Sequence, residues 1–400
     1  MKALILGGSG IQGAAVAQDM VKKESVTEVV IAARRKEALE ATASRLKNEK
    51  LKTRCVDVSD KDGLVKLINK GGFDVVVSSV PWRVAIPPLE ASIEAGVNLL
   101  DFGLYQNLAF DENISKFDEN AKNRGATVVP SCGVAPGLTN MLAGHGASKL
   151  DKVNKIHIFV GGIPEKPLPP LGYKTVWSLE GVWTEYSGKC RIIRDGKMDE
   201  VDAASEIEFI DFPKVGRLQA FYTDGIGTLL HSYKEPLLKG VKEVYEKTLR
   251  WPGHIEKIYT LRECLLLDIE PIKVKGVEIS PRRFLTTLLN PLLKLGEEER
   301  DMTVLRVDVI GSKEGSDAEY TFYMADYRDM KTGVLSMART TGYTGSIVAQ
   351  MMYEGKIKEK GIVMPEKLGA DQAIFKEILR EYAKRNIAIE EEHKFRRALS

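Results

Sequence analysis

The residues with the clearest chemical meaning are the glycines that follow the first apolar segment of the chain. Ala3–Leu6 is short and aliphatic, and Gly8-Ser9-Gly10-Ile11-Gln12-Gly13 comes directly after it. The spacing fits G-x-G-x-x-G. The first glycine permits a tight turn, the second lets a diphosphate approach the backbone, and the third lets a helix pack against the strand. The first turn of that helix offers unpaired amides to an anion. We therefore predict that the whole segment, Gly8, Ser9, Gly10, Ile11, Gln12 and Gly13, holds the diphosphate of a dinucleotide.

The end of the next apolar run bears on which dinucleotide would bind. An acidic residue about twenty residues past the glycines typically binds the ribose 2′-hydroxyl of NAD. Ile31-Ala32-Ala33-Arg34-Arg35 has no acid there, and two arginines follow Ala33. Because guanidinium groups suit a phosphate, we predict that Ala33, Arg34 and Arg35 lie at the 2′-phosphate of NADP, with NAD as the alternative. The other interpretation is that the two arginines begin a solvated helix.

Three further segments follow apolar runs, and we predict that they also contact the cofactor. Asp57-Val58 follows the third run, where the adenine edge is usually met, and Ser78-Ser79-Val80-Pro81 follows the fourth, at the crevice where ligands bind. Ser131-Cys132-Gly133 follows the sixth run and should line the nicotinamide region. The alternatives are an ordinary strand-ending turn for the second segment and a small buried hydrophobic role for Cys132.

These segments belong to a regular alternation of short apolar runs and helical patterns over the first 130 residues. The runs are rich in aliphatic residues, as strands buried on both faces should be. They are Ala3–Leu6, Val29–Ala33, Thr53–Val56, Val75–Val77, Val97–Leu100 and Thr127–Val129. Strands that alternate with helical crossovers predict an α/β fold with an N-terminal Rossmann domain, a doubly wound parallel sheet.

The pattern changes after about residue 135, and 400 residues exceed the usual size of one hydrophobic core. Strand-like runs such as Val153–Val160 are joined by longer connections, and Pro164–Pro170 is typical of a stiff loop. Helical patterns return near the end of the chain. We predict a dinucleotide domain over residues 1–135, an α+β substrate domain over 136–340, and a helical tail, 341–400, that packs back on the first domain.

The overall composition limits the kinds of binding partner that we expect. The chain is 44% hydrophobic and 28% charged, and its formal net charge of +2 gives no reason to expect a nucleic acid or an anionic membrane. No apolar run is long enough to span a bilayer, and the first residues are too short for a signal-peptide core, so we expect a cytoplasmic protein. The four cysteines and five histidines form no ligand motif, so we predict no metal.

Longer blocks of the chain resemble the saccharopine dehydrogenase family. They are Ser131-Cys132-Gly133-Val134-Ala135-Pro136-Gly137-Leu138-Thr139-Asn140, Pro169-Pro170-Leu171-Gly172-Tyr173-Lys174 and Thr248-Leu249-Arg250-Trp251-Pro252-Gly253-His254, among others in the same order. Within the family the chain looks most like the L-lysine 6-dehydrogenases. The resemblance implies a second domain that binds substrate and forms a homodimer. It also implies an NAD(P)-dependent oxidoreductase that removes a hydride from the amine-bearing carbon of an amino acid, after which the imine is hydrolysed.

Two alternatives stay open. Ala33-Arg34 departs from the lysine enzymes, which carry an aspartate at that place, and is more similar to the NADP-using, glutamate-forming saccharopine dehydrogenases. The non-enzyme alternative is a dinucleotide-binding sensor that uses the fold without catalysis. A second arginine or lysine able to bind a carboxylate would favour the saccharopine enzyme, because saccharopine carries three carboxylates.

Some of the matching residues have side chains suited to the substrate. Thr248 and Arg250 match a stretch that holds a substrate carboxylate in saccharopine reductases, and a guanidinium fork suits that anion. Asp101 ends the fifth run, where it could hold a substrate ammonium or accept its proton. Proton removal is required, because a lysine amine has a pKa of about 10.4 and an ammonium cannot support hydride loss. The alternative for Asp101 is a helix cap or a structural ion pair.

The remaining candidates follow the proline-rich loop. Tyr173, Lys174, Glu185 and Tyr186 could form the far wall of the substrate site, with the glutamate against a substrate ammonium. Packing between domains is the alternative for each. His254, four residues after Arg250, is a candidate acid–base group, or else a loop or cap residue.

Overall fold

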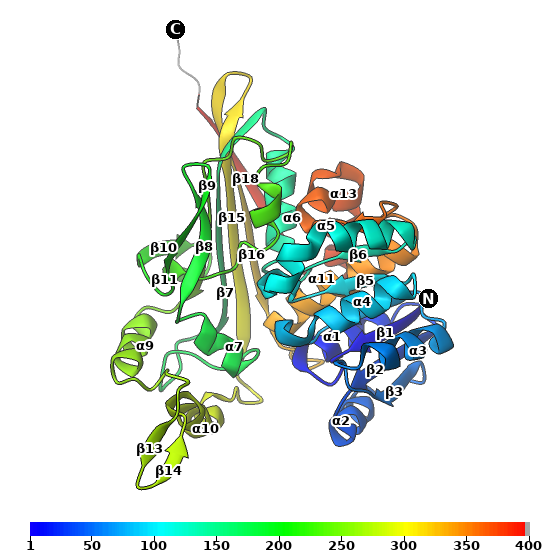
Figure 1. The fold of residues 1–400 in the computed structure, drawn as a ribbon. Coiled ribbons are helices and arrows are strands. Elements are labelled where there is room, and N and C mark those ends of the chain that lie inside the picture. Colours follow the sequence, from blue (N-terminus) through cyan, green and yellow to red (C-terminus); the bar gives the residue numbers. More distant parts are fainter. Residues whose placement is uncertain (397–400) are drawn as a thin grey trace.

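The computed structural model describes residues 1–396 and contains two large sheets side by side (Figure 1). All six runs predicted as strands in the first part of the chain are strands. Together with Gly361–Ile362 (β17) from the end of the chain they form a parallel sheet in the order β17-β6-β5-β4-β1-β2-β3. Their bounds are Lys2–Leu6 (β1), Glu28–Ala33 (β2), Leu51–Cys55 (β3), Val75–Ser78 (β4), Asn98–Asp101 (β5) and Thr127–Val129 (β6).

Helices cover both faces of this sheet, which explains its continuous apolar strands. Successive residues of β1 enter two separate cores, Ile5 on one face and Leu4 and Leu6 on the other. The helices between the strands are α1 (Ile11–Met20), α2 (Lys36–Leu46), α3 (Lys61–Gly71), α4 (Ile86–Glu94) and α5 (Leu108–Asn123), with 3-10 turns η1 (Trp82–Val84) and η2 (Leu104–Gln106). The predicted Rossmann fold is therefore confirmed.

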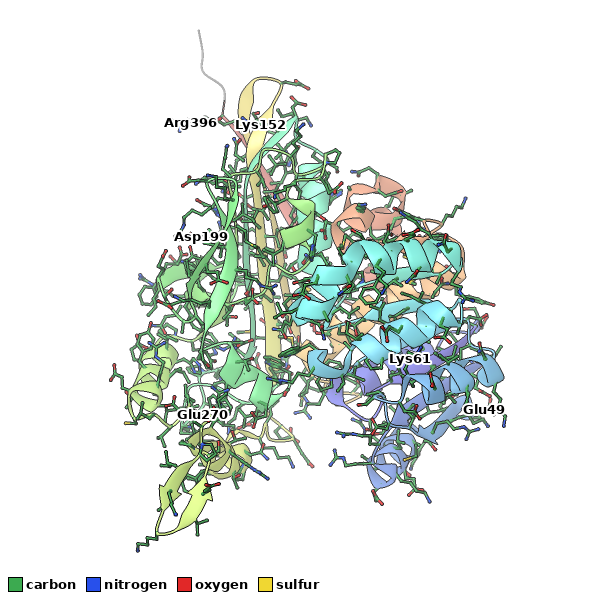
Figure 2. All side chains as sticks on the ribbon, viewed as in Figure 1. Glu49, Lys61, Lys152, Asp199, Glu270 and Arg396 are labelled. Atoms are coloured by element: carbon green, nitrogen blue, oxygen red, sulfur yellow. The ribbon has the colours of Figure 1, made fainter. Side chains whose placement is uncertain are left out.

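The second sheet is mixed and has the order β10-β11-β12-β7-β15-β16-β18, with β8 beside β12 and β9. Strands β7 and β12 run parallel, whereas their neighbours pair antiparallel. The bounds are Lys152–Pro164 (β7), Lys189–Arg194 (β8), Lys197–Asp202 (β9), Glu208–Phe212 (β10), Gly216–Tyr222 (β11), Glu243–Arg250 (β12), Asp301–Lys313 (β15), Ser316–Tyr327 (β16) and Glu390–Arg396 (β18). Figure 2 labels Lys152 and Arg396 at one end of this long sheet.

The tail returns to the first domain, as the sequence predicted, but it is not entirely helical. It contributes α11 (Ser336–Tyr353), α12 (Pro365–Ala370) and α13 (Gln372–Lys384). A Cβ at Gly342 would lie 2.9 Å from the Cβ of Ala15, so α11 crosses α1 closely. The tail also adds β17 (Gly361–Ile362) to the Rossmann sheet and β18 to the second sheet, and its last four residues lie outside the described ones. The division at residues 135 and 340 stays a proposal.

Short elements surround the lower end of the second sheet (Figure 1). They are α7 (Leu179–Thr184), α9 (His254–Glu263), β13 (Ile272–Val274), β14 (Val277–Ile279) and α10 (Pro281–Leu293); α6 (Leu138–Ala147) and α8 (Leu229–Ser232) lie closer to the first domain. Trp183 of α7 donates its indole N–H to Thr286 of α10 at 2.9 Å, which joins these two helices. Among the described residues, no helix is long and apolar enough to cross a membrane.

Candidate cofactor and substrate site

The glycine turn after β1 has the close packing that a dinucleotide site needs. Gly7 adopts a left-handed conformation, with a φ of +74°, whereas the sequence analysis gave the tight turn to Gly8. A Cβ at Gly8 would lie 2.6 Å from the Cβ of Ile31, and one at Gly13 would lie 2.5 Å from the carbonyl oxygen of Gly7. Each position would therefore clash if it carried a side chain, and the backbone stays bare toward α1.

The start of α1 presents amides that the protein does not use. Gly10 is the N-cap residue and brings no side-chain acceptor, and the first turn contains no acidic residue. Among the described residues, the backbone amides of Ser9, Ile11 and Gln12 donate to no other group. Unpaired amides at a helix N-terminus attract an anion such as a diphosphate.

The two arginines after β2 are available for a phosphate. Arg34 and Arg35 are both exposed, and neither forms an ion pair with a carboxylate in the described part of the chain. Ala33 is half-buried at the end of β2. The amide of Ser59 lowers the pKa of exposed Asp57, and Arg34 adds to this effect, so the predicted adenine-side segment lies beside the arginines. The surroundings fit a 2′-phosphate.

The carboxyl ends of β4 and β5 hold two buried polar groups that face each other. Ser78 and Asp101 are neighbours in register, and the Ser78 hydroxyl is close enough to lower the pKa of Asp101, although neither this hydroxyl nor the Asp101 Oδ2 atom has a hydrogen bond of good geometry with a described group. The Oδ1 atom of Asp101 accepts the amides of Gly103 and Leu104, both at 2.6 Å. Burial raises the pKa of Asp101 to about 6. The Oδ1 atom of Asp101 therefore holds the backbone that leads into η2, and its Oδ2 atom lies beside the Ser78 hydroxyl at the edge where a cofactor would lie.

The segment after β6 closes this edge. Ser131 has a φ of +54°, and its hydroxyl accepts the amide of Tyr105 at 2.9 Å. Cys132 is fully buried, and burial raises the pKa of its thiol, so it has no reactive thiolate. A Cβ at Gly133 would lie 3.1 Å from a methyl group of Thr341. The bare glycine turn, the free amides and the buried polar groups at this edge together fit a nicotinamide dinucleotide.

Across the domain junction, one face of β12 carries three polar side chains. Because side chains alternate along a strand, Glu246, Thr248 and Arg250 point the same way, and all three are buried. The Thr223 hydroxyl donates to Glu246 at 2.5 Å and lies 2.9 Å from the Thr248 hydroxyl. Burial, opposed by the hydrogen bond from Thr223 and aided by the nearby Glu185 carboxylate, raises the pKa of Glu246 to about 8. Glu246 can therefore exchange a proton near neutral pH.

Arg250 is held by groups of the protein itself. Its Nη2 atom donates to Glu185 at 2.6 Å, and its Nε atom donates to the Tyr186 hydroxyl at 3.3 Å. The guanidinium lies 5.0 Å from the centre of the Tyr173 ring. Burial raises the pKa of Glu185, whereas Arg250 lowers it. The arginine that we predicted to grip a substrate carboxylate is thus already neutralised by Glu185.

His254 completes a chain of buried hydrogen bonds behind Arg250. Its Nδ1 atom lies 2.9 Å from the carbonyl oxygen of Leu171, so Nδ1 must carry the proton and donate it. The Nε2 atom then accepts the Tyr186 hydroxyl at 2.9 Å. Burial lowers the pKa of His254 to about 3. Both ring nitrogens are used within the protein, which favours a role in positioning Tyr186, and the acid–base role of His254 stays a prediction.

An ion-pair cluster joins the two domains beside these residues. Arg191 of β8 donates to Asp224 at 2.9 Å, to Asp111 of α5 at 3.1 Å and to the carbonyl oxygen of Tyr105 at 3.1 Å. Burial raises the pKa of Tyr105, and the nearby carboxylates of Asp224 and Glu246 also raise it. Tyr105 follows β5 in the Rossmann domain, so the cofactor edge and the polar face of β12 are neighbours.

The structure brings together most, but not all, of the predicted substrate residues. Tyr173, Glu185, Tyr186, Thr248, Arg250 and His254 belong to one cluster, whereas the Lys174 ammonium donates to the Leu292 carbonyl of α10 and lies away from it. The sequence analysis missed Glu246, Thr223, Asp224 and Arg191. The two-residue alternation that ends at Thr248 and Arg250 could have pointed to Glu246; the other residues come from separate strands and loops.

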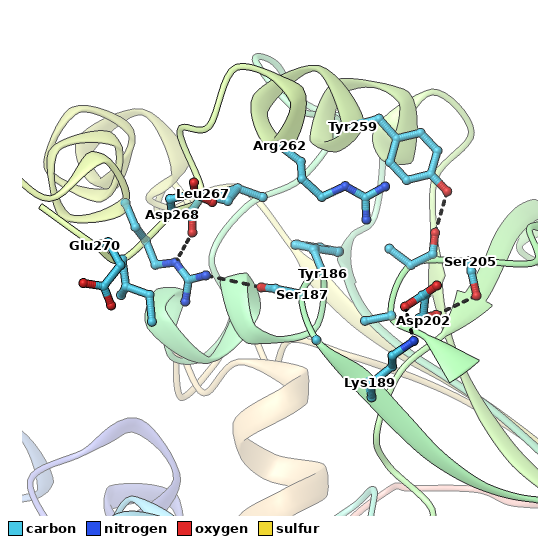
Figure 3. Close-up of a pocket in the computed structure, with 15 residues that line it drawn as sticks. Tyr186, Ser187, Lys189, Asp202, Ser205, Tyr259, Arg262, Leu267, Asp268 and Glu270 are labelled. Carbon is cyan, nitrogen blue, oxygen red and sulfur yellow. Dashed lines mark hydrogen bonds and ion pairs between the residues drawn. The ribbon is translucent and has the colours of Figure 1, made fainter. Parts of the chain in front are cut away.

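One cavity lies outside this junction. It measures about 880 Å³ and opens between α9, α10 and the start of β8 (Figure 3). Its charged groups are mostly satisfied within the protein: Lys189 pairs with Asp202 at 2.7 Å, and Arg282 donates to Leu267 and Ser187. Tyr186 is shared with the buried cluster. We therefore place the site at the domain junction.

The cofactor edge of the Rossmann domain faces buried proton-exchanging groups on the second domain. This arrangement defines a two-domain dinucleotide oxidoreductase. Residues 3–129 match the family model described as Saccharopine dehydrogenase NADP binding domain, and residues 133–387 match Saccharopine dehydrogenase C-terminal domain. The chain belongs to the saccharopine dehydrogenase family. The oxidoreductase class and the cofactor NADP, both predicted from the sequence, are confirmed.

Relatives with curated names share low identity over nearly the whole chain. The chain is 23% identical to Carboxyaminopropylagmatine dehydrogenase of Synechocystis, with 94% of each chain covered. It is 25% identical to Carboxynorspermidine synthase of Vibrio cholerae, covering 81% of this chain and 80% of the relative. The solved saccharopine dehydrogenase of Saccharomyces cerevisiae has a TM-score of 0.79 and 21% identity, covering 98% and 99% of the two chains, and confirms the fold. The predicted proximity to lysine 6-dehydrogenases stays a prediction.

Proposed function

We propose that this protein is an NADP-dependent dehydrogenase that acts on the C–N bond of an amino acid with a distal amine, with L-lysine as the first candidate. The observation that carries the proposal is the charge at the domain junction. Glu185, Glu246 and Asp224 lie there, and the guanidinium groups of Arg250 and Arg191 are already paired with protein carboxylates. Such surroundings suit a cationic amine better than an additional anion.

This charge distribution bears on the alternatives. Saccharopine carries three carboxylates and would need free cations, but Arg250 and Arg191 have no unpaired charge to offer. The second candidate is a carboxylated polyamine, since two relatives are named for agmatine and norspermidine derivatives. An acidic site suits the amines of such a substrate equally well.

The residues of the chain supply the proton chemistry. NADP⁺, when bound, supplies the acceptor for a hydride. The substrate amine must first lose its proton, and Glu246 is proposed to take it, because its raised pKa lets it alternate between acid and carboxylate near neutral pH. The hydroxyls of Thr223 and Thr248 fix this carboxyl group, and Arg250 holds Glu185 beside it. The imine that results is hydrolysed by water to an aldehyde and ammonia.

The test is reduction of NADP⁺ with L-lysine, L-saccharopine and carboxynorspermidine, compared at equal concentration. We expect turnover of L-lysine or of the carboxylated polyamine, and little with saccharopine. Preferred turnover of saccharopine would refute the argument from charge. Titration of NADPH without substrate serves as the control, since binding of the cofactor without turnover of any of the three amines would favour the non-catalytic sensor.

A further inference from the structure

One fully buried carboxyl group takes no part in the chemistry described so far. Glu366 lies in α12 of the tail, and burial raises its pKa against the effect of two hydroxyl partners and of nearby His231. The Oε2 atom of Glu366 accepts the Thr228 hydroxyl at 2.6 Å, and its Oε1 atom accepts the Ser232 hydroxyl. A buried acid without an ion-pair partner destabilises the fold unless hydrogen bonds compensate, so these two bonds are what hold Glu366 in the interior.

Glu366 reaches these hydroxyls because α12 lies directly on α6. A Cβ at Gly144 of α6 would lie 1.9 Å from the carbonyl oxygen of Glu366, and a Cβ at Gly369 of α12 would lie 1.8 Å from the carbonyl oxygen of Met141. The two backbones therefore touch where each of them lacks a side chain. Helix α6 lies between the second sheet and the tail helices (Figure 1), so the tail brings Glu366 to the second domain.

The hydrogen bonds at Thr228 run in one direction. Asn140 of α6 donates its side-chain amide to the Thr228 hydroxyl at 2.9 Å and to the carbonyl oxygen of Ile226 at 3.1 Å. Because the Thr228 oxygen accepts from Asn140, its own proton is directed to Glu366. Residues 226–228 are therefore tied to both α6 and α12.

The same stretch of chain reaches Glu246 at its other end. We call residues 223–228 the linking segment. Thr223 donates its hydroxyl to Glu246 at 2.5 Å, and a Cβ at Gly225 would lie 2.3 Å from the Oε2 atom of Glu246. The linking segment therefore joins the carboxyl group of Glu246 to the hydroxyl that Glu366 holds.

We propose that Glu366 is a positioning residue for the reaction, because by holding Thr228 it keeps the linking segment, and with it Thr223, against Glu246. The inference rests on the proposed role of Glu246 as the proton acceptor. Burial raises the pKa of Glu246, and the hydrogen bond from Thr223 lowers it. The linking segment therefore helps to set the pH at which Glu246 becomes a carboxylate.

Two substitutions of Glu366 separate its shape from its hydrogen bonds. Glu366→Leu removes both acceptors and should release the linking segment, whereas Glu366→Gln can still accept the Thr228 hydroxyl through its oxygen and donate to Ser232 through its nitrogen. We expect kcat for amine oxidation to fall by about 10- to 100-fold in the leucine variant, which corresponds to one hydrogen bond to a charged group, and to stay near the native value in the glutamine variant. The KM for NADP⁺ should be unchanged in both.

The pKa of Glu246 is a second readout, and it needs no substrate. NMR titration of the full chain with ¹³C-labelled glutamate carboxyl groups measures it, and Glu246→Gln assigns the signal. We expect Glu366→Leu to raise this pKa by about one unit and Glu366→Gln to leave it native. If the leucine variant does not fold, Thr228→Val should give the same rise, with Thr228→Ser as its control. Ser346→Ala, which removes a buried hydrogen bond to Asp19 elsewhere in the tail, should lower stability and leave the pKa of Glu246 native.

The other charges that act on Glu246 are those of Glu185, Asp224 and Arg250, and they are the same in all these variants. A native pKa of Glu246 in the folded leucine or valine variant would overturn the proposal, and so would equal damage from leucine and glutamine at position 366. A raised pKa in a chain that oxidises none of the three amines would support the positioning role and refute the proposed function instead.

Discussion

Replacing Glu246 with glutamine removes the charge of this side chain but keeps its shape, and it should have opposite effects on stability and activity. Burial raises the pKa of Glu246 from 4.5 to about 8. At 1.36 kcal/mol for each pKa unit, ionisation of this buried group disfavours the folded state by on the order of 5 kcal/mol. The side chain is only 3% exposed, so little of this cost is relieved by solvent.

The sign of the pH dependence follows from proton binding. Between pH 4.5 and about 8 the folded protein holds a proton on Glu246 that the unfolded chain has released, so the native stability falls as the pH rises through this window. Glutamine does not bind or release a proton in this window, so the variant does not lose stability in this way. We expect Glu246→Gln to have a free energy of unfolding similar to that of the native chain at pH 4.5, and higher by a few kcal/mol, on the order of the ionisation cost, above pH 8.

Activity should change in the other direction. If Glu246 accepts the substrate proton, kcat for amine oxidation should fall by about 10²- to 10⁴-fold in the glutamine variant. The native kcat/KM should rise with pH up to about 8, where the carboxylate becomes the main form, and the variant should lack this rise. The assays are denaturant unfolding at several pH values and initial rates of NADPH formation.

Exposed Glu200 of β9 provides the matched control, because Glu200→Gln makes the same charge change on the surface. It should alter neither the stability difference nor the pH profile. The reasoning would be refuted if Glu246→Gln had native activity, or if the stability difference between the two proteins did not depend on pH.

The other predictions concern the cofactor and Arg250. Arg34→Asp should weaken NADPH binding by about 10- to 100-fold and leave NADH little changed, whereas Arg45→Asp, in the last turn of α2, should have no such effect; equal changes for both nucleotides in a titration would exclude a 2′-phosphate contact. Gly13→Ala, whose Cβ would lie 2.5 Å from the Gly7 oxygen, should abolish cofactor binding measured by fluorescence. Arg250→Ala should lower the free energy of unfolding by about 3–5 kcal/mol by leaving Glu185 unpaired, and adding Glu185→Gln should recover part of the loss; a double variant no more stable than the single one would argue against this pairing.

Some of the candidate site could be predicted because it is local in the chain. The glycine turn, the two arginines after β2 and the residues that end the parallel strands follow directly from apolar runs and their spacing. Even there the prediction was incomplete, because the glycine that takes the positive φ is Gly7 and not Gly8. The sequence allowed Asp101 to be either a cap or a site residue. Only the structure shows that its Oδ1 atom accepts a backbone amide while its Oδ2 atom has no hydrogen bond of good geometry.

The sequence by itself determined the Rossmann sheet, the cofactor edge and the preference for NADP, because each depends on neighbouring residues whose periodicity and type are readable along the chain. The tertiary structure alone decided what surrounds the substrate. Arg191, Asp224 and Glu246 come from separate elements that meet only when the second sheet forms. A glutamate can be a surface charge or a buried proton carrier. Which of the two it becomes depends on how much solvent folding removes from the side chain and which charges folding brings near it. Both depend on how the chain packs, and neither can be read from the sequence around the glutamate.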